Sequence, residues 1–205
     1  MAATMKLHWS PKSPYVRKVM ICAHELGMLP KLELVRSVAA MLKPNEALMA
    51  DKPLSKIRTL VREDGRALFD SVVICEYLNE QAKGTLFPPQ GEARWQALRW
   101  HAFGDGLFDA LILWRNERER EQPLKALLEA FELKTRACLE LLDGEAEALA
   151  SAPFSIGQVT IGCALGYLDY RFESLGWRGA APRLAAWFAA LQARPSFQST
   201  EPIDG

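Results

Sequence analysis

The spacing of hydrophobic and polar residues changes repeatedly along the first part of the chain. Residues 6–9 and 32–38 have the short apolar pattern of strands. Between them apolar residues recur with helical spacing, starting after Ser13, which precedes a proline, and ending at Gly27. Residues 39–56 are polar and irregular and contain two prolines, so no regular element is expected there. The pattern predicts a strand, a helix and a second strand.

A second pattern follows directly. Residues 59–62 and 67–69 look like two strands whose short connection contains Gly65 after an aspartate, which is a hairpin signal. Asp70 and Ser71 then precede apolar residues with helical spacing. Short polar side chains at this position cap the first turn of a helix, so a second helix is predicted to begin here.

The remainder of the chain has no strand pattern. Four helical patterns are expected instead, and Ser155 with Gln158 has the spacing of a capping box at the start of the third. The four cover residues 92–120, 123–142, 155–172 and 183–193, and Pro195 is expected to end the last.

The change in pattern predicts two domains. Residues 1–82 form a small α/β domain, residues 83–90, with a glycine and two prolines, read as a linker, and residues 91–205 form an all-helical domain.

Composition narrows the functional classes. The 205 residues carry 25 basic and 25 acidic side chains, so a general binder of nucleic acid or of anionic membranes is not expected. The longest apolar runs are too short to span a bilayer, and residues 1–7 lack the apolar stretch of a signal peptide. The four cysteines are scattered and form no metal-like cluster with histidine, so neither a disulfide framework nor a metal site is predicted. A cytoplasmic location follows as the expectation.

Several segments together resemble a cytosolic glutathione S-transferase of the bacterial, serine-type branch. The segments are 10–19, 52–60, 68–78, 86–88 and the capped helix 154–168, and the resemblance extends over nearly the whole chain. It implies a thioredoxin-like N-terminal domain followed by an all-α C-terminal domain. It also implies glutathione as substrate, no permanently bound cofactor, and a homodimer that pairs the first domain of one subunit with the helical domain of the other.

Activation of glutathione requires its thiol to become a thiolate near neutral pH. Lowering a thiol pKa by about two units takes about 2.7 kcal/mol. One hydroxyl hydrogen bond to a charged group supplies about 1.5–3 kcal/mol, and a helix N-terminus adds about 0.3–1 kcal/mol. Ser13 matches the serine of the serine-type transferases, although a serine before proline is also an ordinary helix cap. Ser10 is the second candidate, with a turn residue as its alternative reading.

The resemblance also implies contacts to the rest of glutathione. Asp70 can pair with the ammonium of the γ-glutamyl end, while Ser71 and the following helix amides hold its carboxylate; alternatively both residues only cap the helix. The backbone of Ile57 is expected to pair with the cysteinyl part like an added strand. Lys43 and Lys56 are possible partners of the glycyl carboxylate, or solvated surface lysines.

Arg58 departs from the family pattern, which has a cis-proline at this position. A cis bond before a residue other than proline costs about 2.5–4 kcal/mol, so a trans Ile57–Arg58 bond is expected. The Arg58 side chain then lies either near the mouth of the site, facing an anionic substrate or a glutathione carboxylate, or in solvent. Replacing Arg58 by proline is expected to tighten glutathione binding, and weaker binding would instead make the arginine a ligand contact.

The second substrate is expected on the helical domain, with Phe108, Ile112 and Arg115 as its lining; packing and surface roles are their alternatives. The sequence therefore predicts a glutathione transferase whose thiolate attacks a small hydrophobic electrophile. The alternative is a non-catalytic binding or regulatory protein of the same fold, which Arg58 favours.

Overall fold

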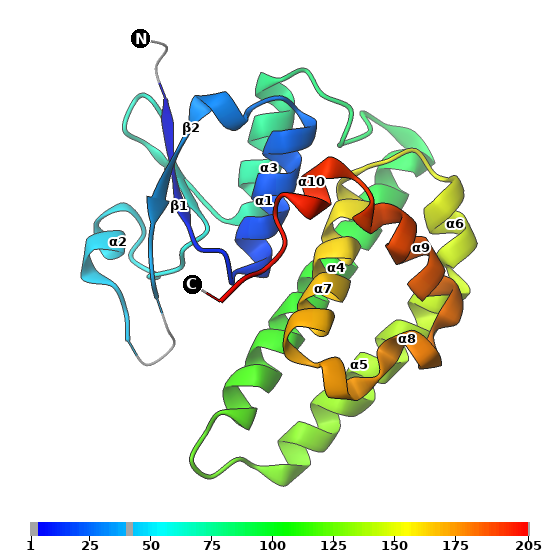
Figure 1. Cartoon of the computed structure of the whole chain (residues 1–205). Coiled ribbons are helices and arrows are strands. Elements are labelled where there is room, and N and C mark those ends of the chain that lie inside the picture. The colour runs from blue at the N-terminus through cyan, green and yellow to red at the C-terminus, as the bar shows by residue number, and fades with distance from the viewer. Residues whose placement is uncertain (1–3, 40–42, 205) are drawn as a thin grey trace. The chain divides into compact units, whose positions relative to one another are not determined.

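The computed structural model describes residues 4–39 and 43–204 (Figure 1). These residues form two compact units. The first extends to Pro88 and includes the C-terminal residues from Ser199, and the second is Pro89–Gln198. The predicted helical domain ran to residue 205, but its last residues belong to the first unit, where Lys12 Nζ lies 3.6 Å from Asp204 Oδ1.

The first unit is built on a four-stranded mixed sheet. Its strands are β1 (Met5–Trp9), β2 (Leu32–Arg36), β3 (Thr59–Val61) and β4 (Ala67–Leu68), in the order β2-β1-β3-β4. β1 is parallel to β2 and antiparallel to β3, and β3 and β4 form the predicted antiparallel hairpin. Gly65 has a φ of +80° in the connection, a value that glycine adopts without steric cost.

Helices cover both faces of this sheet. They are α1 (Pro14–Glu25), the short 3₁₀ helix η1 (Leu29–Lys31), α2 (Glu46–Asp51) and α3 (Ser71–Gln81). α1 and α3 pack together on one face, and α2 lies on the other (Figure 1). Leu7, Leu60 and Ile74 are fully buried, so the core lies between the sheet and the α1–α3 pair.

The ends of α1 and α3 follow the predicted signals. The Ser13 hydroxyl accepts a hydrogen bond from the Val16 N–H, and Asp70 caps α3 by accepting from the Val72 N–H. Gly27, with a φ of +65°, follows the end of α1. Both helices therefore begin with a polar side chain at the edge of the same sheet.

The expectation of no regular element in residues 39–56 is wrong, because α2 lies there. Asn45 caps α2 by accepting from the Leu48 N–H at 3.0 Å. His8 holds the helix in place, since its Nε2 lies 2.9 Å from Asp51 Oδ2 and its Nδ1 2.8 Å from Ser37 Oγ. Six residues between two prolines show too little periodicity to be recognised from the sequence.

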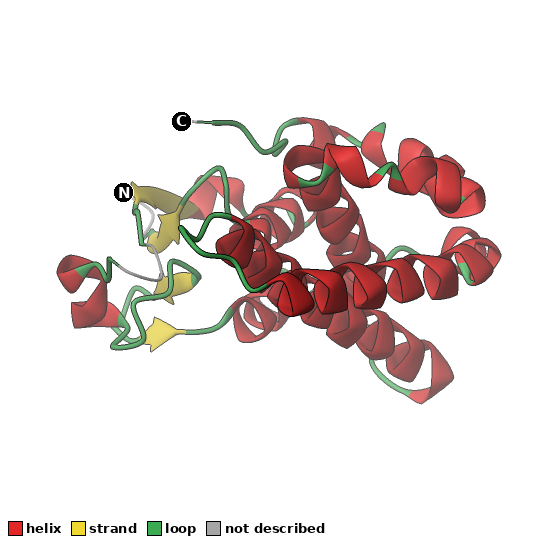
Figure 2. Ribbon diagram, turned by 90° about the horizontal axis from the view of Figure 1, so that it is seen from below, coloured by secondary structure: helices red, strands yellow, loops and turns green. Residues whose placement is uncertain are grey.

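The second unit contains only helices among its described residues (Figure 2). The four predicted helices are present as α4 (Gly91–Arg118), α5 (Lys125–Gly144), α7 (Ile156–Arg171) and α9 (Pro182–Gln192). The shorter helices were not predicted: α6 (Ala146–Ser151), η2 (Glu173–Leu175), α8 (Trp177–Ala180) and α10 (Pro195–Gln198). Pro195, expected only to end a helix, also begins α10, where its missing N–H costs nothing.

The predicted capping box is present at the start of α7. The Ser155 hydroxyl accepts from the Gly157 N–H at 3.3 Å, and the Gln158 side chain accepts from the Ser155 N–H at 3.0 Å. The structure thus confirms the predicted fold class, a thioredoxin-like unit followed by a helical unit.

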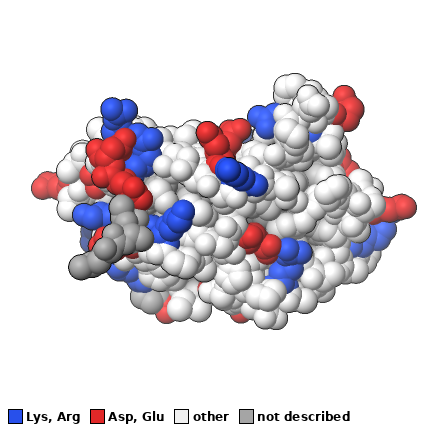
Figure 3. Space-filling view, turned by 90° about the horizontal axis from the view of Figure 1, so that it is seen from above, with Lys and Arg blue, Asp and Glu red and all other residues white. Residues whose placement is uncertain are grey.

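The distribution of charged side chains and the apolarity of the helices agree with the composition of the chain. Basic and acidic side chains are interspersed on the face in Figure 3, in keeping with the balanced charge of the chain. None of the described helices combines the length and apolarity needed to cross a bilayer.

Candidate functional site

One side chain connects the segments that the sequence predicts as the glutathione site. Arg58, just before β3, is 9% exposed. Its guanidinium carbon lies 3.6 Å from the centre of the Tyr15 ring, in the first turn of α1. Its Nε lies 3.4 Å from Asp70 Oδ2, at the start of α3. The turn into β3 and the starts of two helices therefore meet at one guanidinium.

Asp70 and Ser71 occupy the start of α3, as predicted. Asp70 is part exposed, and its Oδ1 accepts from the Val72 N–H at 3.4 Å. Ser71 is almost completely buried. The amides of the first turn of an 11-residue helix have no partners within the helix, so this position favours an anion.

The two candidate serines lie in the turn between β1 and α1. Ser13 is half-buried, and its hydroxyl oxygen already accepts the capping hydrogen bond from Val16. Ser10 is buried, and its hydroxyl accepts from the Lys12 N–H at 3.5 Å. A hydroxyl that accepts one hydrogen bond still has its O–H to donate, so capping and thiolate stabilisation are compatible roles.

The turn before β3 differs from the expectation for Ile57. The Ile57 carbonyl accepts from the Thr59 N–H at 2.7 Å, which closes a three-residue turn. One of the two backbone groups predicted to meet the ligand is therefore engaged within the chain. Lys43 and Lys56 are exposed.

The Ile57–Arg58 peptide bond is trans, as expected. The cis bond found among the described residues joins Phe69 and Asp70 instead.

Lys52 lies beside the candidate site, and the sequence did not reveal this position. It is 1% exposed, its Nζ donates to the Arg58 carbonyl at 3.3 Å, and it lies 4.8 Å from the centre of the Phe69 ring. Burial, followed by the charge of Arg58, lowers the pKa of Lys52 from 10.5 to about 8, while Asp70 acts in the opposite direction. A lysine in a polar, proline-containing segment has the sequence pattern of a surface residue, so no signal distinguished it.

The three residues predicted for the second substrate lie on α4 of the helical unit. Phe108 is fully buried and Ile112 half-buried. Arg115 donates to the hydroxyl of Tyr167, whose pKa is raised by burial. Arg115 also lines a hollow of about 280 Å³, whose other lining residues are Arg118, Glu119, Tyr170 and Arg171.

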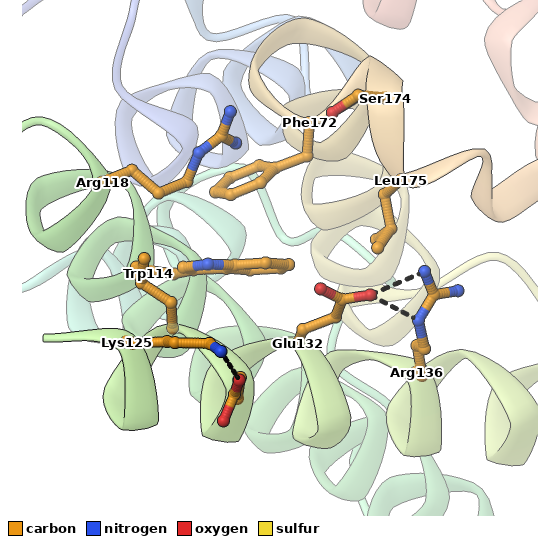
Figure 4. A pocket seen from close by; sticks show the side chains of 10 residues that line it. Trp114, Arg118, Lys125, Glu132, Arg136, Phe172, Ser174 and Leu175 are labelled. Carbon is orange, nitrogen blue, oxygen red and sulfur yellow. Dashed lines mark hydrogen bonds and ion pairs between the residues drawn. The ribbon is translucent and has the colours of Figure 1, made fainter. Parts of the chain in front are cut away.

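A larger hollow of about 350 Å³ lies in the same unit and contains none of the three predicted residues (Figure 4). The Phe172 ring lies between the Arg118 guanidinium, 5.0 Å away, and the Trp114 ring, 4.6 Å away. Across the hollow Arg136 pairs with Glu132 at 2.8 Å. Aromatic packing and an ion pair account for these contacts without a ligand.

Within the described ranges no group of three or more His, Cys, Asp or Glu residues is arranged to hold a metal ion. The contacts at Arg58 bring two buried cations, Arg58 and Lys52, close to the carboxylate of Asp70.

A four-stranded sheet with two capped helices, followed by a helical unit, defines a thioredoxin-like protein with a C-terminal helical domain. Two family models match the chain: "Glutathione S-transferase, N-terminal domain" at residues 12–81 and "Glutathione S-transferase, C-terminal domain" at residues 125–190. The chain belongs to the glutathione S-transferase family.

Known relatives are similar to this chain over nearly its full length. The chain is 30% identical to the "Uncharacterized GST-like protein YibF" of Escherichia coli (strain K12), over 97% of this chain and 98% of that protein. It is 40% identical, with a TM-score of 0.94, to a glutathione transferase family member from Pseudomonas fluorescens Pf-5 solved with bound glutathione, over 98% of this chain and 100% of that one. A glutathione S-transferase from Methylobacillus flagellatus KT, solved with GSH bound, is 34% identical with a TM-score of 0.89 over the same shares.

Proposed function

We propose that the protein binds glutathione in its first unit and is a serine-type glutathione transferase. The observation that carries the proposal is the convergence at Arg58 of the turn before β3, the start of α1 and the start of α3. The two relatives solved with glutathione, at 40% and 34% identity, support the same ligand.

Each part of the ligand has a proposed partner. Ser71 and the first amides of α3 hold the carboxylate of the γ-glutamyl end, next to Asp70. The Ile57 N–H pairs with the cysteinyl backbone. Lys43 or Lys56, both exposed, neutralises the glycyl carboxylate.

Ser13 performs the chemical role, with Ser10 as the second candidate. Its O–H donates a hydrogen bond to the glutathione sulfur, which favours the thiolate, and the thiol proton passes to solvent. The thiolate forms a carbon–sulfur bond with an electrophilic carbon. When that carbon carries a leaving group, the bond to it breaks and the leaving group departs with the electron pair. When it does not, the carbon's π bond breaks and the resulting anion takes a proton from solvent. The electrophile is small and hydrophobic, and Ile112 and Arg115 of α4 are its proposed contacts. Phe108 was the third candidate, but its full burial favours the packing role.

A second candidate function is binding without catalysis. It is favoured by Arg58 in place of the family's proline and by the engaged Ile57 carbonyl. Calorimetric titration with glutathione, followed by a turnover assay with 1-chloro-2,4-dinitrobenzene, separates the two functions. Binding with turnover supports the transferase, and binding without turnover supports the second candidate.

The binding site is tested by the double variant Asp70→Asn with Ser71→Ala. Loss of charge-assisted contacts is expected to weaken glutathione binding by about 1.5–3 kcal/mol. Asp64→Asn, in the β3–β4 hairpin, is the control and should bind glutathione like the unaltered protein. An unchanged dissociation constant in the double variant would remove the α3 start from the site.

A further inference from the structure

The Arg58 guanidinium is held in one orientation by two contacts. Its central carbon lies over the Tyr15 ring, 3.6 Å from the ring centre, and only 9% of the residue is exposed. A stacked guanidinium keeps its in-plane N–H groups for other partners. Arg58 is therefore oriented in advance to donate hydrogen bonds.

Asp70 is already engaged by protein groups. Its Oδ1 caps α3 through the Val72 N–H, and its Oδ2 lies 3.4 Å from Arg58 Nε, a charge contact that lacks hydrogen-bond geometry. A ligand ammonium at Asp70 would meet a carboxylate whose charge is balanced by a fixed cation. The ammonium therefore gains little from this carboxylate.

Arg58, Lys52 and Asp70 form a cluster in which positive charge exceeds negative charge. Lys52, whose ammonium donates to the Arg58 carbonyl, adds a second buried cation near the carboxylate of Asp70. The N-terminus of α3 contributes further positive potential. The cluster thus favours a carboxylate, which a guanidinium binds well because its N–H groups match two carboxylate oxygens.

We propose that Arg58 has replaced the ligand's ammonium as the partner of Asp70, and that it selects glutathione by the α-carboxylate of its γ-glutamyl end. Asp70 thereby acts through Arg58 as a positioning residue, and the amino group of the ligand is dispensable. This inference rests on the proposed glutathione binding and adds which of the two charged groups at that end is recognised.

Two ligand analogues separate these groups without adding bulk. Glutaryl-cysteinyl-glycine lacks only the amino group, and γ-aminobutyryl-cysteinyl-glycine lacks only the α-carboxylate. Calorimetric titration of the unaltered protein is expected to show less than about a threefold loss of affinity for the first analogue. The second is expected to bind at least about thirtyfold more weakly, as for loss of a charge-assisted contact.

Substitution of Arg58 should weaken the dependence of affinity on the ligand's α-carboxylate and strengthen its dependence on the amino group. In Arg58→Met, removal of the α-carboxylate from the ligand should weaken binding by less than about fivefold, because the guanidinium that donates to it is lost. Loss of the amino group should now cost about tenfold, because Asp70 is available to the ammonium. Arg58→Lys keeps the positive charge and serves as the variant with the smaller risk to folding. It should retain the weak dependence on the amino group.

Arg66→Met is the matched control, since Arg66 lies in the β3–β4 connection with its side chain 80% exposed. It should leave the affinity of each analogue, relative to that of glutathione, unchanged. Three results would overturn the inference while glutathione binding stands: equal losses for the two analogues in the unaltered protein, losses that Arg58→Met leaves unchanged, or a strong dependence on the amino group in Arg58→Lys. Absence of glutathione binding to the unaltered protein would overturn the proposed function and this inference with it.

Discussion

Two buried cations, Lys52 and Arg58, lie near one carboxylate in the first unit. Lys52 and Arg58 are both buried, and Asp70 is their acidic neighbour. Desolvation of a charged group opposes folding unless its partners compensate, and the lowered pKa of Lys52 shows that compensation is incomplete. We interpret the arrangement as one retained for the site rather than for stability.

The first residue-scale prediction concerns the stability cost of Lys52. Its pKa of about 8 in the folded protein lies below its ordinary 10.5, so between these values the unfolded chain binds more protons and stability rises with pH. Below pH 8 the penalty is fully present, and at about 1.4 kcal/mol per pKa unit it reaches at most about 3.5 kcal/mol. Lys52→Met should therefore raise the free energy of unfolding at pH 7 by about 1–3 kcal/mol.

Urea denaturation at several pH values measures this effect. The advantage of Lys52→Met should shrink between pH 8 and 10.5, as Lys52 of the unaltered folded protein loses its proton. Lys56→Met, at an exposed neighbouring position, is the control and should show a difference near zero. An advantage that stays constant over this pH range would contradict the buried ammonium as its cause.

The second residue-scale prediction concerns the choice of serine. If Ser13 stabilises the thiolate, Ser13→Ala should shift the pH dependence of turnover upward and leave glutathione binding nearly unchanged. The hydrogen bond to Val16 is lost as well, at about 1 kcal/mol, so stability must be measured beside the rate. Ser10→Ala is the paired variant. An upward shift for Ser10→Ala alone would identify Ser10 as the active serine.

At the scale of elements, α4 and α7 pack closely against each other in the helical unit. A Cβ at Gly104 of α4 would lie 2.7 Å from Thr160 Cγ2 and 3.0 Å from the Thr160 carbonyl carbon on α7. Gly157 of α7 makes a similar approach to α4, where a Cβ would lie 2.7 Å from Trp100 Cβ. Glycine is therefore required at these positions for the two helix backbones to approach each other.

The element-scale prediction compares two glycines of α4. Gly104→Ala should destabilise the protein by about 1–3 kcal/mol, because overpacking outweighs the better helix propensity of alanine. Gly106→Ala has nothing within 4 Å of its new Cβ and should stabilise by up to about 1 kcal/mol. Urea denaturation of both variants gives the comparison. Equal effects would show that α4 and α7 separate readily enough to admit a methyl group.

At the scale of the whole molecule, the prediction is a homodimer, which the family resemblance implies. Residues 1–80 carry 12 basic and 9 acidic side chains, and the remainder carries the opposite excess. Such a division weakly favours contact between unlike domains of two subunits, and salt screens it. Light scattering at micromolar concentration should give about twice the chain mass of 22.9 kDa. A mass near 22.9 kDa would refute the dimer.

The sequence alone determined the elements whose signals are local. Ser13, Gly27, Gly65, Asp70 and the Ser155 box mark helix and hairpin ends, and the structure confirms each of these positions. These signals are local because a cap or a turn is made by neighbouring residues. Together with the family motifs they also determined the fold class. The roles of the predicted site residues stay predictions.

The contacts of the Lys52 and Arg58 side chains became known only from the folded molecule. In the sequence each could equally be a surface cation, because burial depends on residues far along the chain, here Phe69 and Tyr15. The short helices depended in the same way on tertiary packing, as α2 does on His8. A few residues of weak periodicity have no local signal, and the free energy that orders them comes from contacts with distant segments.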